Sequence, residues 1–358
     1  MYHKNSFVAL VVLFMLNCTS DDSPVESETP DAANYFPPLD SEEWATVSPA
    51  SVNWDIDKLQ VLEDFLIEEN TKSFMVLVQG RIVVERYFNG HNATETWPWN
   101  SAGKTLVTAI TGIAQQKGML DIDQRASDYL GTQWTSMPLE KEDGITPYHL
   151  LTMTSGINDE SNWVTKANLT YLADAGDRWS YHNVFQKLID VVQASSREDF
   201  RSYFRQQLED TMGMDGFWNF GPIFTIYHSD TRSMARFGLL ALHMGKWGEE
   251  QVVDTSFFNE SVTASQDLNA SYGYMWWLNG KSSYRVPGSQ NVFQGPLVPN
   301  APDDMYAAMG FNEQRIYVIP SRDMVIVRMG EGSNLGNSNF AVSGFDNAFW
   351  ERMAAVMD

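Results

Sequence analysis

Cysteine is nearly absent from this 358-residue sequence, which contains a single one, Cys18. A lone cysteine cannot form a disulfide within the chain, so a buried core must supply the stability of the fold. Material for such a core is ample, because 43% of the residues are hydrophobic, including 12 Trp and 20 Phe. This composition indicates a packed globular chain of one large domain or two modest ones.

Positive charge is also scarce. The chain has 24 Lys and Arg against 46 Asp and Glu, and no segment is rich in Lys or Arg. A protein that tracks a phosphate backbone needs a basic patch or stripe. Nucleic acid is therefore not expected as a partner.

Several catalytic and cofactor motifs are missing. There is no Gly-x-Ser-x-Gly elbow, no His-Glu-x-x-His, no cysteine pair, no Walker loop and no dinucleotide fingerprint. Isolated histidines are expected at the surface or in the core, not as ligands; they are His91, His149, His228 and His243. No metal and no cofactor are implied.

The N-terminus predicts export. Lys4 is followed by an apolar run over residues 7–16, which is too short to span a bilayer, and the run ends near Cys18. This arrangement resembles a bacterial lipoprotein signal with Cys18 as the lipidated residue. The alternative is a plain secretory signal with an incidental cysteine. We expect an exported protein that is lipid-anchored in the bacterial cell envelope, at the outer membrane, with the anchor as its sole membrane contact.

Three parts follow along the chain: a signal peptide over 1–18, a tether over 19–51 and a folded domain over 52–358. The tether is acidic, rich in Ser and Pro and poor in branched aliphatic residues.

Within the folded domain, hydrophobic periodicity predicts strands near both ends of the chain. A helix is expected over 56–66, a hairpin over 74–90 that turns at Gln79-Gly80, a second hairpin over 315–330 and a closing helix over 345–358. The sheet is expected from about 52–100 and 250–358, and residues 101–249 are expected to be largely helical. The predicted fold class is α+β, with a mainly antiparallel sheet flanked by helices and a helical insert.

The stretch "SAGKTLVTAITGIAQQKG" carries the first candidate site residues. Ser101 and Lys104 share one face at the start of a predicted helix that ends at Gly118, so the lysine amine can reach the serine hydroxyl. Burial beside apolar residues would lower the lysine pKa and make it a base for the serine. The alternative is a helix cap followed by a solvated lysine, because a Ser-x-x-Lys match alone is weak.

The stretch "RWSYHN" carries the second pair, Tyr181 and Asn183. On a loop, residues two apart can point to the same side, where the phenol can share a proton and the amide can hold a substrate carbonyl. The alternative is a pair of loop residues with satisfied hydrogen bonds.

Together, Ser101-x-x-Lys104, Tyr181-x-Asn183 and a late pair of strands resemble the serine β-lactamase and penicillin-binding-protein superfamily. The resemblance is to its class C-like branch, which includes esterases, D-alanyl carboxypeptidases and nylon-oligomer hydrolases. It extends from about Val52 to the C-terminus and includes "ITPYHLLTMTSGI", "ARFGLLALHMGKWG" and "YGYMWWLNG". It implies that Ser101 is acylated, that Lys104 and Tyr181 share the role of base, that Asn183 orients the substrate, and that a strand N–H near Met309 to Phe311 completes the oxyanion hole.

The third motif of that superfamily, Lys-Thr-Gly or His-Thr-Gly, is replaced here by Ala308-Met309-Gly310. Gly310 still permits close approach of a substrate backbone, whereas the cation and hydroxyl that hold a substrate carboxylate are missing. We therefore expect a small-molecule or peptide-like ester or amide substrate and poor β-lactamase activity. Gln314 has two interpretations: a polar group that faces the cleft, or a structural residue, which is the more common role of a glutamine at the end of a strand. The competing hypothesis is a catalytically inactive binding lipoprotein.

Overall fold

The computed structural model describes residues 1, 34–39, 41–221, 223–335 and 344–358. Residues 2–18 of the predicted signal peptide, Cys18 included, and residues 19–33 and 40 of the tether lie outside the described residues, and the export signal stays a prediction. In the described residues, no helix is both long enough and apolar enough to cross a membrane.

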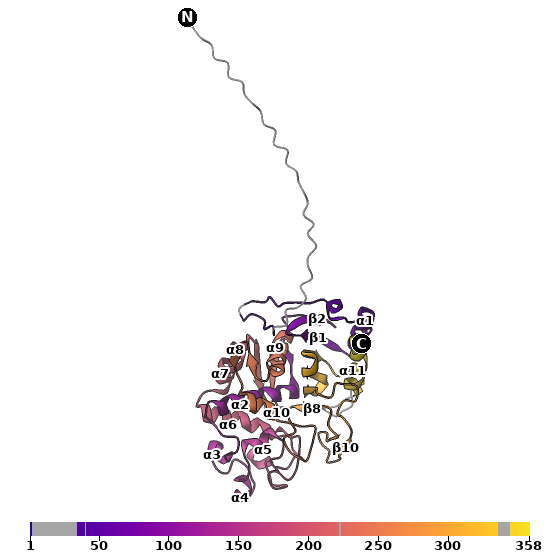
Figure 1. Cartoon of the computed structure of the whole chain (residues 1–358). Coiled ribbons are helices and arrows are strands. Elements are labelled where there is room, and N and C mark those ends of the chain that lie inside the picture. The colour runs from indigo at the N-terminus through magenta and orange to yellow at the C-terminus, as the bar shows by residue number, and fades with distance from the viewer. Residues whose placement is uncertain (2–33, 40, 222, 336–343) are drawn as a thin grey trace. The chain divides into compact units, whose positions relative to one another are not determined.

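The centre of the domain is a six-stranded sheet in which every neighbouring pair is antiparallel (Figure 1). In order across the sheet, its strands are β2 (Arg81–Tyr87), β1 (Thr71–Val78), β13 (Met324–Gly330), β12 (Gln314–Ile319), β11 (Tyr306–Gly310) and β8 (Trp277–Leu278). β1 therefore pairs with a strand from near the other end of the chain, as Val76 pairs with Ile326. The predicted α+β class, with strands from both ends of the chain, is confirmed.

Both predicted hairpins are confirmed. β1 and β2 turn at Gln79 and Gly80, whose φ values of 51° and 76° match the tight turns that fit the right-handed twist of paired strands. A side chain at Gly80 would lie 1.9 Å from the carbonyl oxygen of Tyr35, so this turn also needs glycine for packing.

Tyr35 belongs to a short stretch before residue 52 that packs on the sheet. Trp44 is buried and its indole N–H donates to the Gly80 carbonyl over 2.7 Å, and Thr46 bridges to Ile82. The packed domain therefore begins earlier than the predicted boundary at residue 52, because aromatic residues at the end of the acidic segment are buried.

Helices cover both faces of the sheet. The first and last helices, α1 (Ile56–Glu68) and α11 (Gly344–Met357), lie side by side (Figure 1). They pack on one face, where Phe349 contacts Phe74 and Tyr317. α9 (Thr231–Leu242) packs against β1, β12 and β13 on the other face. The predicted opening and closing helices are confirmed.

The middle of the chain is helical in part. Besides α9, the α-helices of this region are α2 (Lys104–Gln116), α3 (Ser127–Leu130), α4 (Leu139–Glu142), α5 (Pro147–Leu151), α6 (Lys187–Ser196), α7 (Phe200–Phe204) and α8 (Asp210–Met212). The helix α10 (Thr255–Ser261) follows after this region. The expectation of a helical region over 101–249 needs correction at 216–229. There β4 (Gly216–Phe220) and β5 (Thr225–Ser229) form a hairpin, and β3 (Trp97–Pro98) pairs with β5. Aromatic and β-branched residues on either side of a Gly-Pro pair favour strands and a turn.

Short strands complete the structure: β6 (Lys246–Trp247) with β7 (Glu250–Gln251), and β9 (Ser283–Tyr284) with β10 (Phe293–Gln294).

A buried ion pair links α11 to the sheet. Arg315 of β12 donates from Nε and one terminal nitrogen to the two carboxylate oxygens of Asp346, over 2.7 and 2.9 Å. The Tyr317 hydroxyl donates to the same carboxylate over 2.6 Å, and all three side chains are at most 1% exposed. Removing one partner of such a pair leaves an uncompensated charge in the core.

We expect Asp346→Ala to reduce the free energy of unfolding by about 3–5 kcal/mol, measured by urea denaturation, because Arg315 would remain buried without its carboxylate. Asp128→Ala is the matched control, since Asp128 pairs with Arg125 at the surface. Its cost should be below about 1 kcal/mol. Equal losses in the two variants would contradict the importance of the buried pair.

Candidate active site

Ser101 lies in η2 (Asn100–Gly103), a single 3₁₀ turn that leads into α2. The predicted helix over 101–118 therefore begins with a tighter turn, and α2 itself starts at Lys104. The helix stops as expected, because Gly118 adopts a left-handed φ of 66° directly after the last turn. Ser101 is partly exposed, while most of α2 is buried.

Lys104 points back to the serine. Its Nζ donates to Ser101 Oγ over 2.8 Å, and the residue is 5% exposed. Burial lowers the pKa of the Lys104 ammonium from its usual value to about 7. Its Nζ lies 4.6 Å from the centre of the Tyr181 ring and 4.5 Å from that of Phe185. A lysine with a pKa near neutrality can take up the serine proton.

Tyr181 completes a three-residue cluster although it lies far along the chain from the serine. Burial raises the pKa of its phenol above the ordinary value, and a hydrogen bond with Ser101 opposes that rise. The Tyr181 ring packs on Trp277 with ring centres 5.8 Å apart. The structure thus brings together Ser101, Lys104 and Tyr181, and their hydroxyl, amine and phenol can exchange protons.

A loop over 159–162 holds the segment that carries the tyrosine. The Ser180 hydroxyl and the Arg178 guanidinium donate to the Asp159 carboxylate, the latter over 3.1 Å. His182 Nε2 donates to the Ser161 carbonyl over 2.7 Å. These hydrogen bonds fix the chain on both sides of Tyr181 and so position its phenol.

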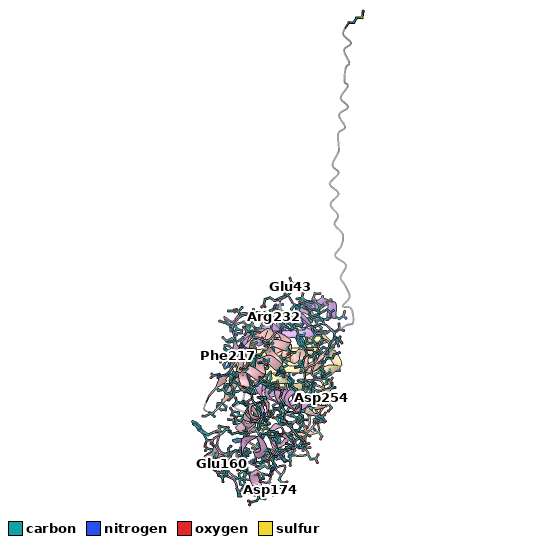
Figure 2. The ribbon with its side chains drawn as sticks, turned by 90° about the vertical axis from the view of Figure 1, so that its left-hand side faces the viewer. Glu43, Glu160, Asp174, Phe217, Arg232 and Asp254 are labelled. Atoms are coloured by element: carbon teal, nitrogen blue, oxygen red, sulfur yellow. The ribbon has the colours of Figure 1, made fainter. Side chains whose placement is uncertain are left out.

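Sequence reasoning missed this loop, because its contacts join residues that are well separated along the chain and follow no local pattern. The loop is at the opposite end of the domain from Glu43, as the position of Glu160 in Figure 2 shows.

Asn183 lines the same cavity as Ser101 and begins η4 (Asn183–Gln186). Its Nδ2 donates to the Asn162 carbonyl over 3.1 Å, so one of its two amide hydrogens is used within the protein. Its predicted contact with the substrate stays a prediction.

The replaced third motif lies at the end of β11, and all of Ala308, Met309 and Gly310 are buried. A side chain at Gly310 would lie 2.4 Å from the Trp99 carbonyl oxygen and 3.0 Å from the Ala102 nitrogen. The missing side chain therefore lets β11 approach the turn that carries the nucleophile. A role for Gly310 in admitting substrate stays a prediction.

The turn between β11 and β12 is held by buried arginines that sequence reasoning did not assign to the site. Arg315 donates to the Gly310 carbonyl over 2.8 Å. Arg328 donates to the carbonyls of Asn312 and Glu313 over 2.7 and 3.0 Å, and both of these residues have a left-handed φ. Arginines inside apolar strands are rare in proteins, and this is the signal that could have identified them.

Gln314 is structural, as expected. It is fully buried, its amide nitrogen donates to the Gly330 carbonyl over 2.6 Å, and its oxygen accepts from the Gly330 nitrogen over 3.0 Å. It joins β12 to β13.

A cavity of about 360 Å³ opens beside the nucleophile. Its lining residues come from η2, the start of α2, η4, the hairpin of β4 and β5, and the β11–β12 turn; they are Asn100, Ser101, Lys104, Asn183, Phe185, Gln186, Phe224, Thr225, Ile226 and Phe311. Among these described residues, Lys104 alone is ionisable. The arrangement offers a nucleophile and a base at the wall of a mostly apolar cavity.

No three His, Cys, Asp or Glu side chains come together as a metal site would require, within the part of the chain that the structure describes.

Among curated protein sequences, none is significantly similar to this chain. Solved structures with similar folds include a β-lactamase from Mycobacterium bovis, 17% identical over 84% of this chain and 99% of that one, with a TM-score of 0.61. A family VIII carboxylesterase is 12% identical over 87% and 98%, with a TM-score of 0.63. A penicillin-binding protein from Bacillus halodurans is 14% identical over 84% and 98%, with a TM-score of 0.56.

These likenesses show the fold, and they include both hydrolytic enzymes and a penicillin-binding protein. The sequence profile of the Beta-lactamase family matches residues 66–339, which span most of the folded domain and include Ser101, Lys104 and Tyr181. The chain therefore belongs to the β-lactamase family, within the β-lactamase/transpeptidase-like superfamily.

Proposed function

We propose that the protein is a serine hydrolase that cleaves an ester or amide through an acyl-enzyme on Ser101. The observation that carries this proposal is the 2.8 Å contact from Lys104 Nζ to Ser101 Oγ, made by a buried lysine whose pKa is lowered to about 7. A serine hydroxyl is a weak nucleophile until a base within hydrogen-bond reach accepts its proton.

In the proposed acylation, Ser101 Oγ attacks the substrate carbonyl while its proton passes to the Lys104 amine, with the Tyr181 phenol as relay. The tetrahedral oxyanion is stabilised by the Ser101 N–H and a strand N–H near Met309 to Phe311. The leaving alcohol or amine takes the proton as the bond to the carbonyl carbon breaks. The same groups then activate water, which releases the acid and frees Ser101.

Binding of a substrate carboxylate is not part of this proposal. The buried Ala308 and Met309 supply neither a cation nor a hydroxyl, and Arg315, on the next strand, is engaged by Asp346. A contact between opposite charges cannot be replaced by apolar side chains.

We expect a fluorophosphonate probe to label the purified protein once, with the added mass on Ser101, because the probe reacts with activated serines. Ser101→Ala should remain unlabelled, and Lys104→Ala should react about 10²–10⁴-fold more slowly because its base is missing. Ser202→Ala, at an exposed serine of α7, is the control and should be labelled like the wild type. An unlabelled wild type would refute the hydrolase and favour a binding protein.

The pH dependence of kcat/KM should follow the titration of the Lys104 amine. The neutral amine is the base, so activity is expected to rise with pH, to be half-maximal near pH 7 and to level off above it. Lys104→Arg retains a charge that does not titrate in this range, and its activity should be low at every pH. A profile that is flat from pH 5 to 9 would exclude Lys104 as the base.

Nitrocefin carries a carboxylate and should be a poor substrate. We expect its kcat/KM to be at least about a hundredfold below that of an uncharged ester with the same protein, because a charge-assisted contact is missing. Steady-state absorbance assays of both substrates measure the ratio. Efficient nitrocefin turnover would show that another group binds the carboxylate.

A further inference from the structure

The cavity beside Ser101 is lined largely by apolar side chains. Phe224 and Ile226 come from the hairpin of β4 and β5, Phe311 from the β11–β12 turn, and Phe185 from η4. Phe224 and Phe311 are about half exposed, at 50% and 48%, so part of their ring surface is in contact with solvent. Large apolar groups that are left half exposed around a hollow gain free energy when an apolar ligand covers them.

The polar side of the cavity is formed largely by neutral amides. Three amides in the lining each donate an N–H to a backbone carbonyl: Asn100 to Phe311 over 2.9 Å, Asn183 to Asn162 over 3.1 Å and Gln186 to Ile223 over 2.9 Å. A carbonyl oxygen can only accept, so these contacts fix which end of each amide is the nitrogen. No described residue donates to the three side-chain oxygens, and Asn100 and Asn183 each retain a second amide hydrogen, so the amides of the lining can offer a ligand neutral acceptors and donors.

A negatively charged group would be poorly accommodated here. Lys104 is the one ionisable side chain in the described lining, and its amine is hydrogen-bonded to Ser101. Neutral amides do not supply a full opposite charge for a carboxylate, and the net charge of −22 on the whole chain opposes the approach of anions. Burying a carboxylate without a partner is costly.

We propose that this cavity is an acyl subsite that selects uncharged, apolar acyl groups, with Phe224 as a specificity-determining residue. The inference rests on the proposed acyl-enzyme function and adds the class of acyl group that Ser101 accepts. Phe224 immediately precedes β5, and its half-exposed ring covers the hollow from the hairpin side.

The test is a series of p-nitrophenyl esters with one leaving group: acetate, butyrate and hexanoate, and the adipate monoester, in which a carboxylate replaces the terminal methyl group of the six-carbon chain. We expect kcat/KM to rise about fourfold per added methylene until the chain fills the cavity. The adipate monoester should be at least about a hundredfold slower than the hexanoate. A flat or falling series, or an adipate ester as fast as the hexanoate, would overturn the inference.

Two variants that add the same charge at different positions test whether Phe224 determines the preference for uncharged acyl groups. Phe224→Arg places a cation at the cavity, so kcat/KM should fall about tenfold for the hexanoate and rise at least tenfold for the adipate monoester. Phe217→Arg is the control: Phe217 lies in β4, is 51% exposed at the surface of the domain (Figure 2), stacks on His228 and does not line the cavity. The kcat/KM values of Phe217→Arg for both esters should match those of the wild type. Equal effects in both variants would assign the change to overall charge and overturn the role of Phe224.

Separate experiments test the proposed hydrolase function and the proposed acyl subsite. If the fluorophosphonate labels Ser101 but the protein shows no preference for apolar acyl groups, the hydrolase function is supported and the acyl subsite is refuted. If the protein is neither labelled nor active on any ester, both the hydrolase function and the acyl subsite are refuted.

Discussion

The proposed chemistry of this site depends on Lys104, which is buried with no carboxylate of the described residues beside it. Burial is the one cause that shifts the pKa of Lys104, and it lowers that pKa to about 7. The ammonium meets a hydroxyl oxygen and two aromatic rings in place of an anion. A carboxylate partner would hold the lysine in its charged form, and a charged lysine cannot accept the serine proton. In the proposed mechanism, the apolar surroundings of α2 are thus a functional requirement as well as a packing result.

Three separate segments must meet around that lysine, and contacts to backbone atoms hold them in register. The nucleophile turn touches the end of β11 where Gly310 lies against Trp99 and Ala102. Asn100 donates to the Phe311 carbonyl and so joins the residue before the nucleophile to the turn after β11. Such contacts fix the positions of main-chain groups, which is what an oxyanion hole made of N–H donors requires.

Two buried arginines of the sheet have partners within the protein. Arg315 pairs with Asp346 of α11 and donates to the Gly310 carbonyl, and Arg328 donates to the carbonyls of Asn312 and Glu313. Both cations therefore stabilise the β11–β12 turn. Ala308 and Met309 give β11 no cation for a substrate carboxylate, and Lys104 is the one ionisable side chain among the described lining residues of the cavity. The half-exposed Phe224 and Phe311 give the same cavity an apolar character.

Periodicity and turn residues were sufficient to predict the elements formed by local sequence. The opening helix, both hairpins, the closing helix and the stop at Gly118 were predicted because the signals for each lie within the element itself or next to it. The same reasoning failed at 216–229, where a hairpin interrupts a region expected to be helical. It also placed the start of the domain too late, because Tyr35 and Trp44 pack on a strand turn that comes much later in the sequence.

The sequence by itself determined the fold class, the family and the residue types of the site: Ser101 and Lys104 at helical spacing, and Tyr181 in its own short motif. Tertiary structure alone decided that these three groups touch, that Asp159 and Ser161 hold the tyrosine segment, and which aromatic residues form the cavity wall. The physical reason is that helix geometry fixes contacts between residues one turn apart. Contacts between segments far apart in the sequence depend on how the whole sheet and its helices pack.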